Sequence, residues 1–475
     1  MRQLDRSAKA PLFQQIITHV IDAIQAGELN PGDKLPPERQ LAANYGVNRS
    51  TVNHALEELV SLGWITRRQG SGTEVAKGRW GSRLAPQYQW QQLLRQAPFT
   101  PDPYLVELNR RKEQPDVLDL HTGELPTSLI PDFSFPAMRW EKILEAENSL
   151  TATGYQPLKD QILAKLASNY GLDGTGQDLL ITSGSSQGIS LLLQSLLSPG
   201  EVVATEEPSF LFSLPMFQSL GILLAGVACD EEGILPEALE QCIIQKKIRF
   251  LYLNPSFQNP TGRLMSLPRR KAIIAVCQKH YVPIIEDDVF GELDFGTPLP
   301  KLKTLATDQV IYLGSLSKLF GPSIKIGWLL APSPLIASLA SAKQRMDVET
   351  NIFSQLLADS ALRSSTYEPN HSRLIAELRQ RGAAFTTSLK PLTADWQVRP
   401  IKGGLYTWLT WRHHLLTRRD WEPFLKAGLL VAPAFLFSND TMSMRINYTR
   451  LEAEHLTDFV QRLATVTKKL KTKEP

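Results

Sequence analysis

Lys318 lies in a stretch of residues that could bind a phosphorylated aldehyde covalently. Two serines, Ser315 and Ser317, precede the lysine, and a second cation, Lys325, follows it. A lysine amine can form a Schiff base with an aldehyde carbon, while hydroxyls and a further positive charge hold a nearby phosphate group. The spacing therefore predicts a covalent cofactor site centred on Lys318.

Three other segments carry side chains that could complete such a site. Ser185 and Ser186 open a predicted helix directly after a strand, and a helix start with hydroxyls can cradle a phosphate. Asn259 follows a second strand and can donate to a phenolate oxygen on a cofactor ring. Asp287 ends a third strand, where a buried carboxylate can pair with a protonated ring nitrogen. Each segment alone is also typical of an ordinary turn or helix cap, but in this order with Lys318 they predict one site.

The apolar pattern around these side chains predicts the scaffold that positions them. Helical segments at 186–197 and 268–280 lie between short apolar runs, which occupy residues 179–182, 202–204, 250–253, 282–285 and 310–313. Such runs are typical of parallel strands covered by helices on both faces. In sheets of this kind, ligands bind just beyond the carboxyl ends of the strands. We therefore predict an α/β domain with the site at that edge of the sheet.

The first 76 residues have a different pattern, which predicts three helices and a β-hairpin. Apolar side chains recur at helical spacing from Leu12 to Ile24, and Gly27 is placed to end that helix. Further helices are expected at 38–44 and 50–62. A strand at 64–68, a glycine-rich turn and a strand at 73–75 follow. Three helices and a hairpin in this order predict a winged helix-turn-helix.

The third of these helices would enter the major groove of DNA through its first turn. The polar side chains expected there are Asn48, Arg49, Ser50, Thr51 and Asn53. Arg49 can pair with a guanine edge or a phosphate, and hydroxyls can bond phosphates. In the hairpin, Arg67 and Arg68 precede the flexible Gly70 and suit phosphates or the minor groove. A helix-turn-helix can also contact proteins, so the pattern alone leaves both readings open.

The segment at 77–114 separates the two patterns. It is rich in Gln, Pro and Arg, and its seven basic and three acidic residues leave a local excess of four positive charges. We predict a mostly extended linker here, and contact with DNA phosphates and a solvated tether stay equally open. The predicted organisation is a DNA-binding domain at 1–76, a linker at 77–114 and a cofactor-binding domain at 115–475.

Composition limits the function classes. A chain of 475 residues with 43% hydrophobic and 21% charged residues is ordinary for globular protein, and its net charge of +3 does not by itself indicate nucleic acid. Its three scattered cysteines, Cys229, Cys242 and Cys277, indicate reduced thiols, and neither they nor the histidines have the spacing of metal ligands. With no apparent signal peptide and no apolar run long enough to span a membrane, we expect a cytoplasmic protein.

Several motifs in the first domain resemble the winged helix of the GntR family. The match covers about residues 10 to 76 and includes PGDKLP at 31–36, ERQLA at 38–42, GVNRSTV at 46–52 and RQGSGT at 68–73. The resemblance implies that the protein binds double-stranded DNA, with contacts from Arg39, Arg49 and the wing at Arg68 to Gly70. Pro37 stands where the family usually has a serine, so a cap or phosphate contact is missing there.

The segments around Lys318 together resemble the fold-type I, pyridoxal-phosphate-dependent aminotransferases, over about residues 115 to 475. The resemblance implies that pyridoxal 5'-phosphate (PLP) forms an internal aldimine with Lys318, while Asp287 meets the pyridine nitrogen and Asn259 the ring hydroxyl. Ser185, Ser186, Ser315 and Ser317 would meet the phosphate. Phe210 would stack on the ring, and Arg445 would bind a substrate carboxylate through its planar fork.

The sequence departs from the aminotransferase pattern at several positions. Lys325 replaces the usual phosphate-binding arginine and loses its bidentate geometry. Val289 and Phe290 stand where a tyrosine usually follows the aspartate pair, which removes a hydroxyl from the ring oxygen. Ser149 stands where a tyrosine often contacts the phosphate across a dimer, and Ala434 stands where a Pro-Gly pair is common. We infer that cofactor binding survives these changes, whereas efficient turnover is less secure.

The union of both halves resembles the MocR subfamily of GntR regulators. This resemblance implies a homodimeric transcription regulator that binds PLP at Lys318. An amino compound, or a B6 vitamer, would alter the aldimine and so alter how the large domain holds the DNA reader. Two other readings stay open. One is a working aminotransferase with an attached DNA-binding domain, and the other is an empty large domain that serves only for dimerisation.

Overall fold

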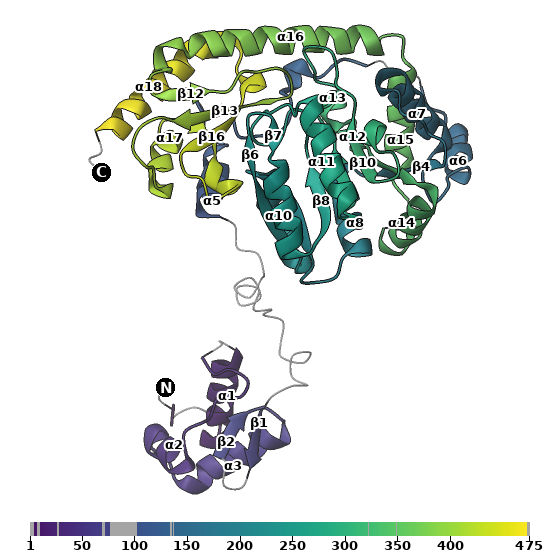
Figure 1. Cartoon of the computed structure of the whole chain (residues 1–475). Helices are drawn as coiled ribbons and strands as arrows, with labels where there is room; N and C mark the ends of the chain where they lie inside the picture. Colours follow the sequence, from purple (N-terminus) through teal and green to yellow (C-terminus); the bar gives the residue numbers. More distant parts are fainter. Residues whose placement is uncertain are drawn as a thin grey trace. The chain divides into compact units, whose positions relative to one another are not determined.

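The computed structural model describes residues 4–6, 10–25, 28–68, 72–76, 102–133, 135, 137–321, 323–347 and 349–472. The chain divides into two compact units, residues 1–97 and 98–475 (Figure 1). Among the described residues, no helix is both long and apolar enough to cross a membrane. The predicted positions of residues 77–101 and of Gly70 lie outside the described part of the chain.

The N-terminal unit contains the predicted three helices and hairpin. Its elements are α1 (Leu12–Gln25), α2 (Glu38–Tyr45), α3 (Arg49–Ser61), β1 (Ile65–Arg68) and β2 (Gly72–Val75). Ile16, Val20 and Ile24 of α1 are buried against Val52 and Leu56 of α3. The regularly spaced apolar side chains of the helices therefore pack into one shared core.

A glycine makes the tight turn between α2 and α3. Gly46 lies in the left-handed region, with φ 63°, and its N–H bonds to the carbonyl of Ala43, 3.3 Å away. Glycine adopts this conformation without the strain that a Cβ brings. Asn48 then precedes the first residue of α3. The turn thereby exposes the N-terminal end of α3, where Arg49 begins the helix.

The C-terminal unit is built on an eight-stranded sheet. In spatial order its strands are β4 (Gln177–Thr182), β11 (Gly327–Pro332), β10 (Val310–Ser315), β9 (Ile284–Asp287), β8 (Ile248–Leu253), β5 (Val202–Glu207), β6 (Leu223–Asp230) and β7 (Gly233–Ile234). The pairs β10–β9, β9–β8, β8–β5 and β5–β6 are parallel, whereas β11 runs antiparallel to both of its neighbours. The predicted, mostly parallel sheet is confirmed.

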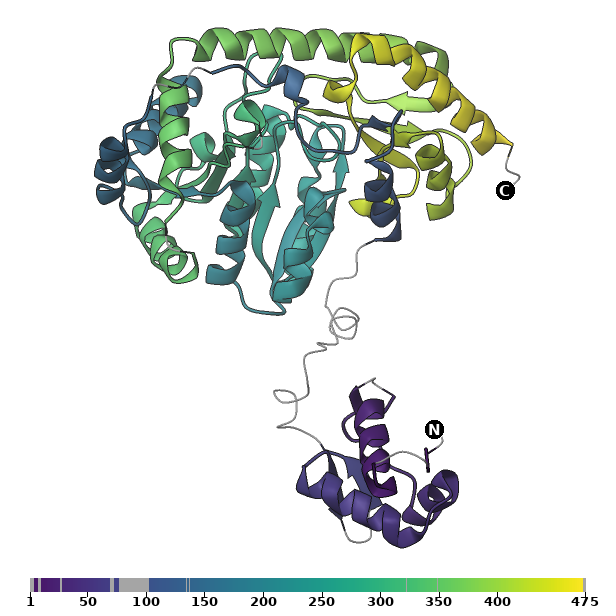
Figure 2. The same ribbon diagram turned by 180° about the vertical axis from the view of Figure 1, so that it is seen from behind.

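Helices cover both faces of this sheet because successive side chains of each strand alternate between two cores (Figures 1 and 2). In β5, for example, Val203 and Ala204 belong to different cores. One face packs against α8 (Ser185–Leu196), α9 (Pro215–Leu220) and α14 (Ser333–Met346). The other packs against α10 (Pro236–Lys246), α11 (Leu267–Lys279) and α12 (Leu302–Leu305).

Further helices extend the second face and connect it to a smaller subdomain. These are α6 (Trp140–Asn148), α7 (Gln156–Tyr170), α13 (Ser317–Phe320), α15 (Ile352–Arg363) and the long α16 (Tyr367–Ser388), which runs along one edge in Figure 1. The subdomain has a four-stranded sheet of β12 (Trp396–Val398), β13 (Tyr406–Trp411), β16 (Ser443–Asn447) and β15 (Ala432–Pro433). Beside it lie α17 (Glu422–Lys426), α18 (Leu456–Lys471) and the parallel pair β14 (Leu429–Leu430) and β3 (Leu118–Asp119). Short 3-10 turns, η1 to η7, lie at Thr127–Leu129, Phe210–Ser213, Lys390–Leu392, Arg418–Trp421, Ala434–Leu436, Tyr448–Arg450 and Ala453–His455.

One segment differs from the predicted extended linker. Residues Pro103–Arg111 form helix α5, which belongs to the C-terminal unit. Asp102 caps the helix by accepting from the N–H of Tyr104, and Pro103 suits the first helical position. Tyr104 and Leu108, one turn apart, are buried in the core of the small subdomain. The charged residues on its other face give this segment the composition of a linker, which explains the wrong prediction for this part.

Candidate functional site: a cavity at the strand ends

A cavity of about 550 Å³ lies where several strands of the central sheet end. Its lining includes most of the residues that the sequence singles out, namely Ser185, Ser186, Phe210, Asn259, Asp287, Lys318 and Arg445. Ser185 follows β4, Phe210 follows β5, and Asn259 follows β8. These strands run in the same direction, so their carboxyl ends meet at one edge and bring the side chains together.

The cavity wall separates two neighbouring aspartates. Asp287 lines the cavity and accepts from the hydroxyl of Tyr252 and, at 3.2 Å, from the N–H of Val289. Asp288 is committed elsewhere, because it lies 2.7 Å from the ammonium of Lys301 and accepts from Tyr312 at 2.8 Å. Asp287 is therefore the carboxylate that is available to a ring nitrogen in this cavity.

The carboxyl group of Asp287 should make the stability of the cofactor-free protein depend on pH. Burial raises its pKa from 3.8 to about 6, against the opposing hydrogen bonds from Tyr252 and Val289. Because the folded state holds the proton more tightly, the stabilisation is complete below pH 3.8 and is lost as the pH rises through about 6. The shift corresponds to on the order of 3 kcal/mol.

We expect Asp287→Asn to remove this contribution, so that the free energy of unfolding falls less between pH about 4 and about 7 than in wild type. Denaturant unfolding of both proteins at each pH measures the difference. Glu206 and Glu286, whose pKa values burial raises to about 7, keep their own pH dependence in both proteins. Parallel pH profiles for the two proteins would contradict the assignment.

The amine of Lys318 is held by a backbone carbonyl that the sequence did not single out for it. Lys318 lies in α13, directly after β10, and its Nζ donates to the carbonyl oxygen of Gly123 at 2.8 Å. The hydroxyl of Tyr406 donates to the same oxygen at 3.2 Å. Two polar groups on different elements therefore share one acceptor in the wall of the cavity.

Arg445, on β16, is buried and fixed by contacts on several sides. One of its guanidinium nitrogens donates to the side-chain oxygen of Asn259 at 2.8 Å, and another donates to the carbonyl of His121 at 2.7 Å. The guanidinium carbon also lies 4.4 Å from the ring centroid of Tyr406 and 4.9 Å from that of Phe437. Its Nε is buried without a hydrogen-bond partner. The arrangement holds a planar cation at the wall of the cavity.

The predicted phosphate ligands fall into two groups. Ser185 and Ser186 line the cavity at the first turn of α8. Gly327 allows this approach, since a Cβ there would lie 2.5 Å from the carbonyl carbon of Gly184. The other residues, Ser315, Ser317 and Lys325, are not among the lining residues. The two serine hydroxyls instead donate to the carbonyls of Ile326 and Ile324, and Lys325 is exposed.

Two further residues of the cavity were not identified from the sequence. Tyr252 is buried in β8 and donates to Asp287, although in the sequence it looks like one more apolar strand position. His121 lines the cavity, and its Nδ1 is buried without a hydrogen-bond partner. Burial, assisted by the positive charge of Arg445, lowers the pKa of His121 to about 3, so its ring is neutral. Neither residue belongs to a motif, so only the fold reveals them.

The donors and acceptors of the cavity fit PLP. A lysine amine, a buried carboxylate and a helix start with two serines lie around one space, as an aldehyde, a ring nitrogen and a phosphate require. The unpartnered Nδ1 of His121 and Nε of Arg445 mark polar positions that the protein alone does not satisfy. Buried polar atoms of this kind are rare without a ligand or water.

In the N-terminal unit, the residues predicted to contact DNA differ in their surroundings. Asn48, Arg49 and Ser50 are exposed at the start of α3, Thr51 is half-buried, and Arg39 is exposed on α2. Arg67 is paired with Glu38 and donates to Asn53 at 2.9 Å, so it ties β1 to α2 and α3. The side chain of Arg68 and all of Gly70 lie outside the described part of the chain.

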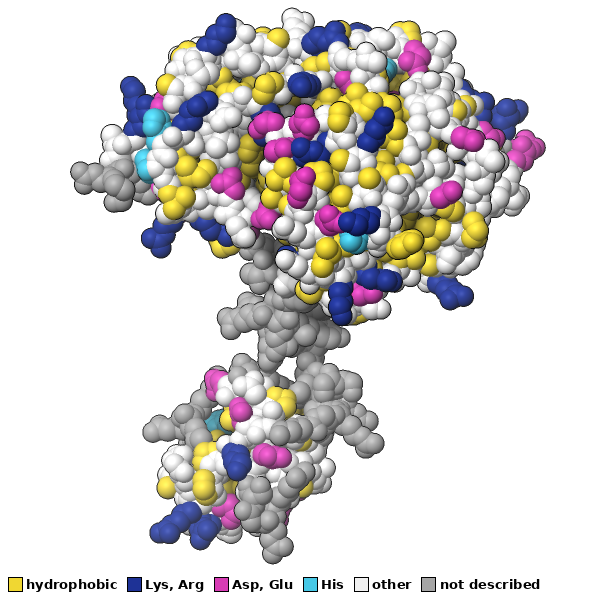
Figure 3. All heavy atoms as spheres, viewed as in Figure 1, with side chains coloured by type: hydrophobic (Ala, Val, Ile, Leu, Met, Phe, Trp, Pro, Cys, Tyr) yellow, Lys and Arg dark blue, Asp and Glu magenta, His cyan; other side chains and the backbone are white. Residues whose placement is uncertain are grey.

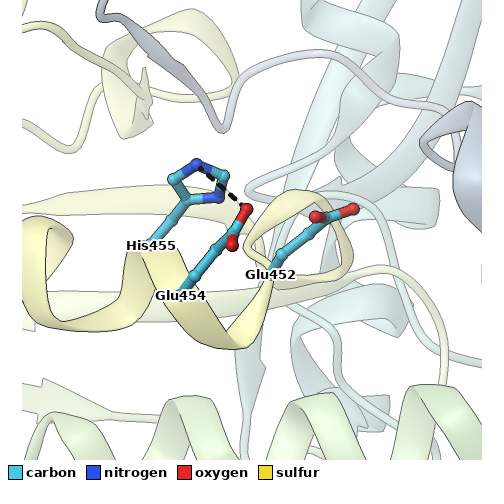
Figure 4. Close-up of side chains that lie close together, drawn as sticks. All are labelled: Glu452, Glu454 and His455. Carbon is cyan, nitrogen blue, oxygen red and sulfur yellow. Dashed lines mark ion pairs between the residues drawn. The ribbon is translucent and has the colours of Figure 1, made fainter.

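Charge elsewhere does not mark a second nucleic-acid surface on the face drawn in Figure 3, where acidic and basic side chains of the C-terminal unit are interspersed. Among the described residues, one group of potential metal ligands lies close together, at Glu452, Glu454 and His455 (Figure 4). Glu452 already accepts from Ser128 at 3.0 Å and lies 4.0 Å from Arg381, and Glu454 is 75% exposed. We assign no metal to this cluster.

Comparisons with known proteins agree with this division. Residues 115–463 match the family model for aminotransferase class I and II, and residues 12–75 match that for bacterial regulatory proteins of the gntR family. The HTH-type transcriptional regulator YdfD of Bacillus subtilis is 33% identical over 479 residues, which cover 97% of each chain. This chain is a MocR-type transcription regulator. In MocR-type regulators a GntR helix-turn-helix, which binds DNA, is fused to an aminotransferase class I/II domain, and the predicted family is confirmed.

Further similar proteins support both the MocR-type family and the aminotransferase fold of the C-terminal unit. The HTH-type transcriptional regulator NorG of Staphylococcus aureus is 28% identical over 92% of this chain and 100% of its own. The kynurenine aminotransferase of Pyrococcus horikoshii, solved in complex with PMP, is 26% identical, with a TM-score of 0.73 over 82% of this chain and 100% of that one. LysN, the α-aminoadipate aminotransferase of Thermus thermophilus, is 27% identical, with a TM-score of 0.67 over 81% and 99%. The predicted aminotransferase fold type I is confirmed, and class I/II aminotransferases typically bind PLP.

Proposed function

We propose that this regulator holds PLP at Lys318, and that an amino compound or a B6 vitamer controls its binding to DNA through that site. The shared cavity supports this most strongly, because Lys318, Asp287 and Arg445 all face it. A ligand that displaces the Lys318 amine changes what fills the cavity. If the ligand binds two conformations of the protein with different affinities, it shifts their populations. DNA binding changes as a result if the two conformations hold the DNA-binding domain differently.

Each residue of the cavity has a proposed task. PLP, when bound, supplies an aldehyde and an electron-withdrawing ring. Lys318 would hold the aldehyde end, and Asp287 would keep a proton on the ring nitrogen. Asn259 would bond the ring hydroxyl, and Phe210 would cover the ring. The phosphate would be held by Ser185 and Ser186. Ser315 at the end of β10, and Ser317 and Lys325 after it, would join them only by leaving their present positions outside the cavity lining.

A working aminotransferase is the alternative, and the cavity supports it in one respect. Lys318 and Arg445 line the same cavity. Transamination requires this, because the lysine amine exchanges with the substrate amine while the arginine binds the substrate carboxylate. The departures at Phe290, Ser149 and Lys325 weigh against rapid turnover, since the first two remove a hydroxyl that would fix the cofactor and the third loses bidentate bonding to its phosphate. We therefore place regulation first and transamination second.

One experiment separates these readings. The full-length protein is titrated with amino acids, amines and B6 vitamers while its absorption spectrum and its affinity for the DNA upstream of its own coding sequence are both followed. A spectral change coupled to a change in DNA affinity, without continued turnover, supports the regulator. Steady keto-acid production with a keto-acid acceptor would support the enzyme. A colourless protein that gains no colour with PLP would contradict both and favour a dimerisation platform.

We also propose that the regulator is a homodimer. An apolar surface on α6 and α15 supports this, with Trp140 63%, Leu144 42% and Phe353 40% exposed. The ring centroids of Trp140 and Phe353 lie 6.3 Å apart, so exposed apolar side chains of the two helices adjoin each other. Large apolar groups gathered at a surface are typical of an interface. Sedimentation velocity of the full chain tests this, and a monomer at micromolar concentration would contradict it.

For the DNA reader, we expect Arg49→Ala to weaken binding to a specific DNA site by roughly tenfold or more, because a guanidinium bidentate to guanine contributes about 1 to 3 kcal/mol. Arg49 is exposed at the start of α3, where it is free to enter a groove. Fluorescence anisotropy with the protein's own upstream DNA measures the change. Lys468→Ala, which removes an exposed charge from α18, serves as the matched control. Equal affinities of wild type and the Arg49 variant would refute the contact.

A further inference from the structure

The tyrosine hydroxyl that is absent beside the aspartate pair has a close counterpart on another element. Phe290 is 2% exposed, and together with Val289 it stands where the aminotransferases that this chain resembles usually carry a tyrosine. Its ring contacts the ring of Tyr406 edge to face, with centroids 5.5 Å apart. Tyr406 comes from β13 of the small subdomain, more than a hundred residues later in the chain. The cavity therefore contains a phenol next to the position that lacks one.

The hydroxyl of Tyr406 points to the atom that also holds Lys318. It donates to the carbonyl oxygen of Gly123 at 3.2 Å, and the Nζ of Lys318 donates to that oxygen at 2.8 Å. A Cβ on residue 123 would lie 2.7 Å from the Tyr406 hydroxyl, so the glycine makes room for it. Hydroxyl and amine thus lie on the same side of the cavity, within reach of the same group.

The ring of Tyr406 is fixed, but its O–H bond is not. Phe290 packs against it, and the guanidinium carbon of Arg445 lies 4.4 Å from its centroid. Tyr406 is 3% exposed, so the ring is enclosed by these neighbours. A phenolic O–H can still turn about its C–O bond and choose another acceptor. The hydroxyl is therefore placed accurately and can leave the carbonyl of Gly123 when a better acceptor arrives.

We propose that Tyr406 is a positioning residue for Lys318 and the group bound to it, and that it supplies from β13 the hydroxyl that Phe290 lacks. This inference rests on the proposed binding of PLP. With PLP bound at Lys318, the hydroxyl of Tyr406 would be free to leave the carbonyl of Gly123 and donate to an acceptor of the bound group. A hydrogen-bond donor stabilises the deprotonated form of its partner, because that form carries the greater negative charge. Tyr406 should therefore lower the pH at which the linkage loses its proton.

The test is a spectroscopic pH titration of the full-length protein loaded with PLP. Tyr406→Phe keeps the ring and removes only the hydroxyl, so we expect the midpoint of the colour change to rise by about one pH unit, a tenfold change in proton affinity. Tyr448→Phe is the matched control. Tyr448 is also buried in the small subdomain and donates to a glycine carbonyl, that of Gly404, at 2.8 Å, but it does not line the cavity. Its loss should leave the midpoint unchanged.

The outcomes separate this inference from the proposed function. A wild type that takes up no PLP contradicts the proposed function. A coloured wild type whose midpoint equals that of Tyr406→Phe overturns the role of Tyr406 alone, as does an equal shift in Tyr448→Phe. If Tyr406→Phe does not fold, 3-fluorotyrosine at position 406 replaces it. This more acidic phenol is a stronger donor and should lower the midpoint, and no change would overturn the inference.

Discussion

Lys318→Ala protein is expected to bind no PLP covalently and to lose the absorption band that PLP gives to the wild type. The reason is that the cavity offers its aldehyde-binding amine through Lys318, which is anchored 2.8 Å from the carbonyl of Gly123. Borohydride reduction followed by peptide mass spectrometry measures the covalent product. Lys390→Ala, at an exposed lysine in the same unit, should keep the full adduct. An adduct on any other lysine of the Lys318 variant would refute the assignment.

The same variant should also lose most of the stabilisation that PLP gives to the wild type. A ligand that binds only the folded state stabilises it by about 2.7 kcal/mol at a hundred times its Kd. At the same PLP concentration, a variant with weaker binding gains less. Thermal unfolding of both proteins with and without PLP measures this gain. Equal gains would mean that PLP binds without the help of Lys318.

The second large effect is expected from Arg445→Leu, which should weaken the response to amino acids on the order of a hundredfold, because two charge-assisted hydrogen bonds to a carboxylate are lost. The response is read as the spectral change of the PLP-loaded protein during titration with the amino acids that shift the wild type. The matching amines without a carboxylate provide the control within each protein. Their weaker response should be the same in the variant and in wild type.

Two further measurements test whether Arg445 has only a structural role. Arg445 also fixes the side chain of Asn259 and the carbonyl of His121, so the variant must be shown to bind PLP before its response is compared. Arg445→Lys keeps the charge but loses the fork and should fall between wild type and the leucine variant. An equal loss for amino acids and amines would show that Arg445 supports the cavity only as structure.

The sequence predicts those parts of the site that follow from strand direction. Asp287 lies at the end of a strand and Asn259 and Lys318 lie in the segments that follow strands, and parallel strands bring their carboxyl ends to one edge of the sheet. That inference needs only the local sequence of each segment and not the pairing of segments that are far apart in the chain. The order of the strands, with the antiparallel β11 between β4 and β10, could not be obtained in the same way, because strand pairing depends on contacts far apart in the chain.

What the sequence could not supply are contacts made by elements from another part of the chain. Gly123 precedes the sheet and Tyr406 follows it, yet the carbonyl of Gly123 accepts from both Lys318 and Tyr406. Neither residue type by itself indicates a place in the cavity, because a glycine is typical of turns and a tyrosine of strands. The division between Asp287 and Asp288 is similar, because it depends on the position of Lys301 and Tyr312. Only packing decides such questions.

Helix α5 packs in the core of the small subdomain and also lines the cavity, although its charged composition resembles that of a linker. It is the first described element after the N-terminal unit, and its Tyr104 hydroxyl donates to the carbonyl of Val431 at 3.0 Å. Leu105 of this helix and Lys112, just beyond it, line the cavity. The first described helix after the N-terminal unit thus contributes directly to the wall of the cavity. We expect a ligand that fills this cavity to contact α5 directly, with no strand of the central sheet in between.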